Sequence, residues 1–150
     1  MSLKVDPTIF KSEDLGEKDV TLNMDHEDAV EYVREVCEKH GFGIPLEFSP
    51  SDLLNRKVEA DRDPYYVLGA CNPDVANQAL DQTMRLGGLF PCNMVIWEEE
   101  PGVQKVYHIS IMKVARLIGI APDNKEWQEI VDKTGNLVEA VFEELQSRDS

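Results

Sequence analysis

The chain has 150 residues, a common size for one domain, and its 29 acidic against 15 basic residues give a net charge of −14. Binding to nucleic acid needs clustered Lys and Arg to neutralise phosphates, so nucleic acid is excluded as an expected partner. Anionic membrane surfaces are disfavoured for the same reason. No segment has the roughly 18 consecutive apolar residues of a membrane span, and the N-terminal residues lack the apolar core of a signal peptide. We therefore expect a cytoplasmic protein without membrane association.

The acidity itself has two interpretations. A charged surface keeps a cytosolic protein dissolved. Salt-adapted proteins also carry an excess of acidic residues, whose mutual repulsion is screened at high ionic strength. Both interpretations fit the composition.

The first third of the chain predicts two strands around a helix. Residues 1–17 show little periodicity and are expected to form an arm ahead of the domain. Alternating apolar residues predict a strand over residues 20–24. Asp25 is expected to cap a helix that ends at Gly41, and a second strand follows over residues 42–48.

The middle third predicts a strand between two helices. A Ser-Pro pair at residues 49–50 starts a short helix around residues 52–56. Aromatic and β-branched residues predict a third strand over residues 65–71. An Asn-Pro pair at residues 72–73 is typical of a helix start, and the two glycines at residues 87–88 mark the end of that helix.

Two further strands are predicted over residues 89–98 and 103–111, joined by a turn at residues 100–102. One face of the second of these strands is mostly apolar and aromatic. The other face carries Gln104, Val106, His108 and Ser110. We interpret this polar set as a solvated face and not as a catalytic one, and we expect His26, in the first turn of its helix, to face solvent as well.

The last helix has the clearest pattern in the chain. Asp123 and Glu126 predict a capping box, and apolar residues then recur at helical spacing over about residues 124–146. About five strands with helices between and after them indicate a single α+β domain of two layers over residues 18–150. We expect a mainly antiparallel sheet with the helices packed on one face.

Two Cys-Asn elements give the chain its most specific motif. Residues 67–73 read Val-Leu-Gly-Ala-Cys-Asn-Pro, and residues 89–95 read Leu-Phe-Pro-Cys-Asn-Met-Val. A strand ending in Cys-Asn-Pro, coupled to a strand opening with Leu-x-Pro-Cys-Asn, resembles the domain of unknown function 302 family. The resemblance extends over roughly residues 18–118. It implies a compact α+β domain, often dimeric, with no agreed activity or cofactor, and we expect no cofactor here.

Cys71 is the candidate catalytic residue. It ends a strand immediately before Asn72 caps a helix, so its sulfur is expected near free backbone N–H groups and the positive end of the helix dipole. Such a setting lowers the pKa of a cysteine and raises its reactivity. The alternative is a small apolar residue that fills the junction between strand and helix, because free cysteines are often buried.

Cys92 follows Pro91, which suggests an edge strand or a bulge. A strand–helix–strand connection usually makes its two strands parallel. Cys71, at the end of one strand, and Cys92, near the start of the other, would then lie about a strand length apart. A disulfide needs Cα atoms within ~7 Å, so we expect no bond between them.

The remaining cysteine, Cys37, belongs to an apolar helical stripe and is expected in the core. Its spacing to His40 would suit metal ligands, but a structural zinc site needs four ligands, and the sequence has no second pair at close spacing. We therefore predict three free thiols in a reducing compartment and no bound metal.

Two hypotheses on function follow. The first is a binding or regulatory module that acts as a homodimer and holds a small molecule in a groove lined by Cys71, Asn72, Cys92 and Asn93. The second is a thiol-dependent enzyme, or a protein that handles sulfur or redox equivalents, with Cys71 as the reactive group. A purely structural role through the final helix is a third possibility.

Overall fold

The computed structural model describes residues 14–148, so most of the predicted arm lies outside the described residues. Within this range five strands form one sheet in the order β1-β5-β4-β3-β2, and each neighbouring pair is antiparallel. The strands are β1 (Lys18–Asn23), β2 (Gly43–Phe48), β3 (Tyr65–Cys71), β4 (Cys92–Glu100) and β5 (Val103–His108).

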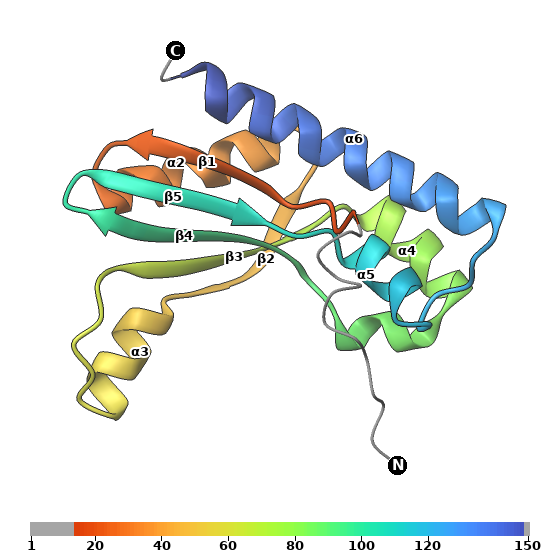
Figure 1. The fold of residues 1–150 in the computed structure, drawn as a ribbon, viewed down its shortest axis with the longest axis horizontal. Coiled ribbons are helices and arrows are strands. Elements are labelled where there is room, and N and C mark those ends of the chain that lie inside the picture. Colours follow the sequence, from red (N-terminus) through yellow and green to blue (C-terminus); the bar gives the residue numbers. More distant parts are fainter. Residues whose placement is uncertain (1–13, 149–150) are drawn as a thin grey trace.

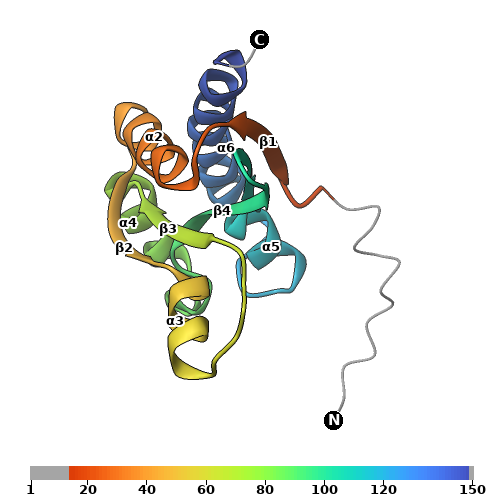
Figure 2. The same cartoon turned by 90° about the vertical axis from the view of Figure 1, so that its left-hand side faces the viewer.

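The helices of the described range are α2 (His26–Lys39), α3 (Pro50–Lys57), α4 (Pro73–Gln82), the 3-10 helix η1 (Met84–Gly88), α5 (Ile111–Leu117) and α6 (Lys125–Ser147). Figure 1 shows α2 and α6 along the sheet, α4 and α5 together near one end of it, and α3 beyond the other end. Turned by 90°, the sheet curves around α2 and α6, which lie on the same side of it (Figure 2). The predicted α+β fold, with an antiparallel sheet and helices on one face, is confirmed.

The core has two parts, and α6 contributes to both. The first lies between the sheet, α2 and the C-terminal half of α6, and the second between α4, α5 and the N-terminal half of α6. Leu137, near the middle of α6, packs against both. This single long helix therefore fixes α4 and α5 relative to the sheet.

The helix caps follow from local chemistry. Ser49 and Asn72 each accept a backbone N–H of the first turn, as predicted. Asp25 occupies the predicted cap position of α2, but its side chain makes no capping hydrogen bond. The cap of α6 is Asn124 and not Asp123: the Asn124 side chain accepts the N–H of Trp127 at 2.8 Å. Trp127 is fully buried and its Nε1 donates to the carbonyl of Met112, so the packing of the indole sets where the first turn begins.

The expectation that the strands on either side of α4 are parallel was wrong. β3 and β4 are antiparallel, with Ala70 opposite Cys92. The physical reason is the return path: α4 ends at Gln82, and η1 brings the chain back to the end of the sheet at which β3 stopped. β4 then starts at Cys92, three residues later than predicted, in the interior of the sheet and not at an edge.

The expectation of a solvated face on β5 was also wrong. Gln104, Val106 and His108 are at most 1% exposed and lie under the helices, whereas Lys105 and Tyr107 are half-buried on the open face. Alternation separates the two faces of a strand but does not say which one is covered. The buried polar atoms find partners: His108 Nδ1 lies 2.8 Å from the carbonyl of Asn93, and Gln104 Oε1 lies 2.7 Å from Nδ1 of the half-buried His26.

Candidate functional site

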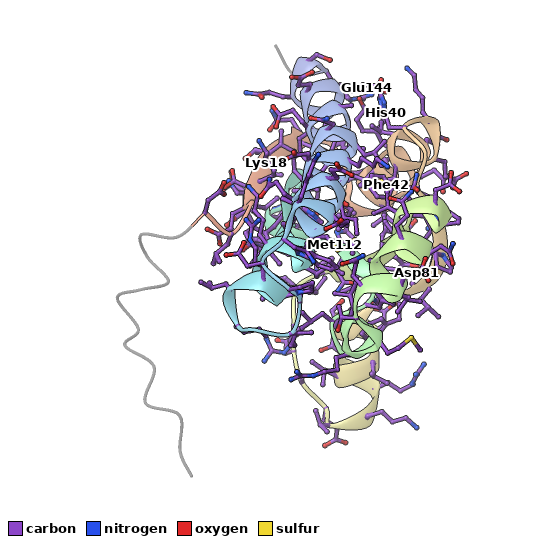
Figure 3. All side chains as sticks on the ribbon, turned by 90° about the vertical axis from the view of Figure 1, so that its right-hand side faces the viewer. Lys18, His40, Phe42, Asp81, Met112 and Glu144 are labelled. Carbon is purple, nitrogen blue, oxygen red and sulfur yellow. The ribbon has the colours of Figure 1, made fainter. Side chains whose placement is uncertain are left out.

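A cavity of about 370 Å³ opens where the end of β3 meets the start of β4. It lies at the junction of the two parts of the core, because its walls include residues of both. Its lining comes from the segment around β2 (Phe42, Pro45, Leu46), the end of β3 (Ala70, Cys71, Asn72), α4 (Val75, Ala76), the return segment (Gly87, Phe90, Pro91, Cys92), α5 (Met112) and α6 (Thr134, Leu137). Figure 3 labels two of these lining residues, Phe42 and Met112. We call this space the apolar cavity.

The walls of the apolar cavity are almost entirely carbon. None of the lining residues is charged, and the polar side chains among them are two thiols, one amide and one hydroxyl. The hydroxyl, on Thr134, donates to the carbonyl of Ile130 within α6. The cavity therefore offers an incoming molecule apolar contact and few hydrogen bonds.

Asn72 lines the apolar cavity, but its amide has structural partners. Its Oδ1 accepts the N–H of Val75 at 3.1 Å, which caps α4. Its Nδ2 donates to the carbonyl of Gly41 at 2.9 Å, which ties α4 to the chain that leaves α2. Asn72 therefore holds the wall of the cavity in place, with one remaining amide hydrogen for any ligand.

The two thiols are neighbours, because Ala70, the residue before Cys71, pairs with Cys92. Side chains that pair across strands share one side of the sheet, so Cys92 lies on the buried side with Ala70. Cys71, the last residue of β3, lines the same cavity and is close enough for its thiol to affect that of Cys92. Both sulfurs are unpaired, and a disulfide would need converging Cβ vectors. The predicted separation of about a strand length was wrong.

The cysteine thiols differ in their exposure to solvent. Cys92 is only 7% exposed, and this burial, with a smaller contribution from Cys71, raises the pKa of the Cys92 thiol to about 12. Burial likewise raises the pKa of Cys37, in the core, to about 12. Cys71 is half-buried. Among the three cysteines it is the one that an external reagent can reach from the cavity.

Asn93 lies apart from the other three candidate residues. It follows Cys92 on β4, so its side chain points to the other face of the sheet, where it is exposed. Its backbone carbonyl is the partner of His108 Nδ1. The structure thus brings Cys71, Asn72 and Cys92 to one cavity and leaves the side chain of Asn93 outside.

Several residues that line the apolar cavity could not be identified from the sequence. Phe42, Met112 and Leu137 are ordinary core residues by pattern, and they are far apart along the chain. Only the antiparallel return of β4 and the passage of α6 over this end of the sheet bring them together. Helical periodicity marks Leu137 as inward-facing, but it does not distinguish a cavity wall from a packed contact.

Other kinds of site find little support in the described residues. Between residues 14 and 148 no three His, Cys, Asp or Glu side chains are grouped so that they could hold a metal ion. His40 pairs with Glu144 on α6, 3.1 Å from its Oε1, while Cys37 is sealed in the core. Over the same range no helix has both the length and the apolar character needed to cross a membrane.

The fold and the cavity define a small α+β domain with helices on one face of an antiparallel sheet and an apolar cavity at one end. The chain belongs to the family described as domain of unknown function DUF302, whose model matches residues 18–145. A solved relative, the uncharacterized conserved protein DUF302 from Bacillus stearothermophilus, superposes with a TM-score of 0.73 at 21% identity, over 86% of this chain and 97% of its own. At that identity the likeness is one of fold. No curated protein matches the chain.

Proposed function

We propose that this domain is a binding module that holds a small, largely apolar molecule in the apolar cavity. One observation carries the proposal: a cavity of about 370 Å³ without a charged side chain in its walls, in a protein whose net charge is −14. Ligand pockets usually measure about 300–1,000 Å³ and are lined by apolar side chains with a few polar groups. Here the few polar groups are the Cys71 and Cys92 thiols and the spare amide hydrogen of Asn72.

Binding of a neutral apolar fluorophore, N-phenyl-1-naphthylamine, tests this proposal. We expect saturable fluorescence enhancement with the native protein and a loss of affinity of about tenfold in Ala76→Leu, because the added side chain takes up part of the cavity. Asp81→Leu is the matched control, since Asp81 lies on the same helix, is exposed and does not line the cavity. Equal affinity of the native protein and Ala76→Leu would contradict the proposal.

The alternative, a thiol-dependent activity, is favoured by one feature: the half-buried Cys71 lines the same cavity beside Cys92. It predicts fast alkylation of Cys71 in the native protein at neutral pH, at a rate above that of a free cysteine. Cys37 and Cys92 should react only after unfolding, because the pKa of each thiol is raised to about 12. Peptide mass analysis of native and unfolded samples locates the label. Native labelling of Cys71 no faster than that of free cysteine would reject a catalytic thiol.

We further propose that the domain acts as a homodimer through the open face of its sheet. On that face Tyr65 stacks on Trp97, with ring centroids 6.1 Å apart, and Trp97 lies 6.3 Å from Tyr107. Leu46 and Phe48 of the edge strand β2 are 64% and 52% exposed. Extended apolar surface of this kind is typical of an interface. The charged groups beside these rings bond within the same chain, Lys105 to Asp19, Glu99 to Trp97 and Glu17 to Tyr107. The ring faces therefore remain available to a second copy.

Sedimentation equilibrium tests the homodimer. Phe48→Glu should shift the protein toward the monomer, because it would place a charge against the partner copy. Met84→Glu is the control: Met84 is 80% exposed on η1, away from the sheet face. A monomeric native protein would reject this part of the proposal and leave ligand binding untouched.

We also propose a cytoplasmic location. It is supported by the three unpaired cysteines, since free thiols persist in reducing compartments. Fractionation of cells that produce the native protein would test it.

A further inference from the structure

A second, smaller cavity of about 140 Å³ lies on the other side of α6, and His108 is part of its wall. Figure 3 shows Lys18, at this second cavity, and Phe42, at the apolar cavity, on opposite sides of α6. The smaller cavity is lined by the N-terminal segment and β1 (Gly16, Lys18), by the end of β5 and the start of α5 (His108, Ser110, Lys113) and by α6 (Thr134, Gly135, Val138, Glu139). We call this space the histidine pocket.

The pocket has a buried floor and an exposed rim. His108, Thr134 and Val138 are at most 4% exposed, whereas Gly135 and Glu139 are exposed on the surface of α6. A Cβ atom added at Gly135 would meet no other atom within 4 Å. The rim is therefore open at Gly135, next to the floor residue Thr134.

His108 presents an unused hydrogen-bond acceptor. Its Nδ1 faces the carbonyl of Asn93 at 2.8 Å, and a carbonyl only accepts, so Nδ1 carries the proton and neutral Nε2 keeps its lone pair. The structure gives Nε2 no protein partner. Among the described residues no buried side-chain nitrogen or oxygen is both sealed and without a partner. Nε2 is therefore the atom through which the ring meets the open space of the pocket.

The charge of the walls is unusual for this protein. Lys18 and Lys113 stand against one carboxylate, Glu139, so the lining has an excess of positive charge. In the described part of the chain, the four other cavities compared have at least as many acidic as basic side chains in their walls. In a molecule of net charge −14, the two lysines of this lining are the groups that could attract a small anion.

The polar groups also have complementary roles. The Lys18 ammonium pairs with Glu139 and the Lys113 ammonium with Asp14, but each ammonium has further protons to donate. The Ser110 hydroxyl accepts the N–H of Lys113, and its own proton is free to donate. The pocket thus offers several donors together with one acceptor at Nε2.

We propose that the histidine pocket binds a short-chain carboxylic acid, with one carboxyl oxygen hydrogen-bonded to His108 Nε2 and the other facing the Lys18 and Lys113 ammonium groups. The site is separate from the apolar cavity and does not depend on the function proposed for it. A carboxylate oxygen and neutral Nε2 are both acceptors, so binding from neutral solution takes up one proton, which is held between them. No covalent bond forms or breaks.

The proton uptake gives binding a pH dependence with a definite sign. The charged groups that share the pocket with His108 are Lys18 from β1, Lys113 from α5 and Glu139 from α6, with Asp14 paired to Lys113. Burial lowers the pKa of His108 below 6.5, so the imidazole is neutral at pH 7. The affinity for acetate should therefore fall as pH rises through the neutral range, by up to about tenfold per pH unit.

The experiment is a titration of the full chain with acetate, followed by amide NMR shifts, with uncharged acetamide as a parallel probe. We expect saturable shifts at Ser110, Lys113 and Gly135 with acetate and none that saturate with acetamide. Lys113→Met should weaken acetate binding about fivefold or more. Lys133→Met is the matched control, because Lys133 lies on α6, bonds to Gln78 and does not line the pocket.

Three results would overturn the proposal: acetate shifts that stay linear, acetamide that binds as well as acetate, or equal weakening by both lysine variants. Linear acetate shifts would mean that the pocket holds water only. Equal binding of acetamide would mean that the pocket is polar but does not prefer an acid. The third would assign the effect to overall charge. Because neither lysine is buried, both variants are expected to fold.

Discussion

Asn72 illustrates how a residue can line a cavity while most of its polar capacity serves the fold. Its Oδ1 caps α4 and its Nδ2 holds the carbonyl of Gly41, 31 positions earlier in the chain. The first bond is local and could be predicted from the Asn-Pro pair. The second depends on where α2 ends in space. The same amide thus stabilises a helix start and positions the wall of the apolar cavity.

Replacement of Asn72 separates these two contributions. Asn72→Ala loses both bonds, and we expect the free energy of unfolding to fall by about 1–2 kcal/mol. Asn72→Asp keeps the capping oxygen and loses the donor to Gly41, so its loss should be the smaller one. Urea unfolding of the three proteins is the measurement. Stability of Asn72→Ala within a few tenths of a kcal/mol of the native protein would show that neither bond matters.

His108 makes stability depend on pH below about 7. Burial lowers its pKa in the folded state below the ordinary 6.5, so the unfolded chain binds more protons as pH falls through this range. Stability should be highest above pH 6.5 and decline below it, with a slope of up to about 1.4 kcal/mol per pH unit. Urea unfolding at several pH values tests this.

His108→Gln is the control for that slope, since it keeps a donor for the Asn93 carbonyl and does not titrate. The carboxyl groups of Asp14, Glu47 and Glu144 have pKa values lowered by their hydrogen bonds to cations or hydroxyl groups. Their contribution is lost only below about pH 4.5, which is below the pH at which the decline due to His108 begins. A slope that persists in His108→Gln would assign it to another group.

At the scale of elements, local signals located the helix starts, although Asn124 replaces Asp123 as the cap of α6, whereas the non-local expectation for β3 and β4 failed. Ser49 and Asn72 start helices where the sequence predicted them, because a cap depends on a few adjacent residues. The pairing of β3 with β4 depends on how far the intervening helix carries the chain, and α4 with η1 carries it back. For that reason the sequence could not predict that Cys71 and Cys92 line the same cavity.

The same distinction applies to the candidate site. Three of the four candidate residues, Cys71, Asn72 and Cys92, line the apolar cavity, since each lies at a terminus of a strand or a helix at the same end of the sheet. Asn93 shares a motif with Cys92, yet strand alternation sends its side chain to the other face. His108 was assigned to solvent, and only the position of α6 over β5 makes it part of a buried floor.

Gly69 on β3 tests the close packing of β3 against the wall of the apolar cavity. A Cβ atom at this position would lie 2.6 Å from Cγ of Pro91 and 2.9 Å from the carbonyl oxygen of Leu46, two residues of the cavity wall. Gly69→Ala should therefore lower the free energy of unfolding by about 1–3 kcal/mol through overpacking. Gly88→Ala, where an added Cβ meets nothing within 4 Å, is the control and should change stability little. Equal unfolding midpoints in urea would contradict this account of the wall.

At the scale of the whole molecule, α6 connects the features described above. It joins the two parts of the core through Leu137 and separates the two cavities, with Thr134 in the walls of both. Ion pairs and hydrogen bonds tie its C-terminal half to β1 through Lys18 and to the end of α2 through Lys39 and His40. A ligand in either cavity would therefore contact the helix on which the packing of the other depends.

The net charge of −14 provides the last prediction. Like charges repel in the compact state, so screening should stabilise the fold, and the melting temperature should rise from dilute buffer into sodium chloride. The ion pairs of the surface, such as Arg34 with Glu47, weaken in salt as well, but exposed pairs contribute only about 0–1 kcal/mol each. A flat or falling curve would show that repulsion between the acidic residues is not a significant term.

The shape of that curve distinguishes the two interpretations of the acidity. Screening acts over about 10 Å at 0.1 M salt and about 3 Å at 1 M. An acidic surface that serves only solubility should therefore reach its full stabilisation by a few tenths molar. Adaptation to high salt predicts a melting temperature that still rises toward molar sodium chloride, because the folded surface then holds ions that the unfolded chain does not. Sodium chloride is the appropriate salt, since sulfate would stabilise the fold through its exclusion from the protein surface, whatever the charge of the protein.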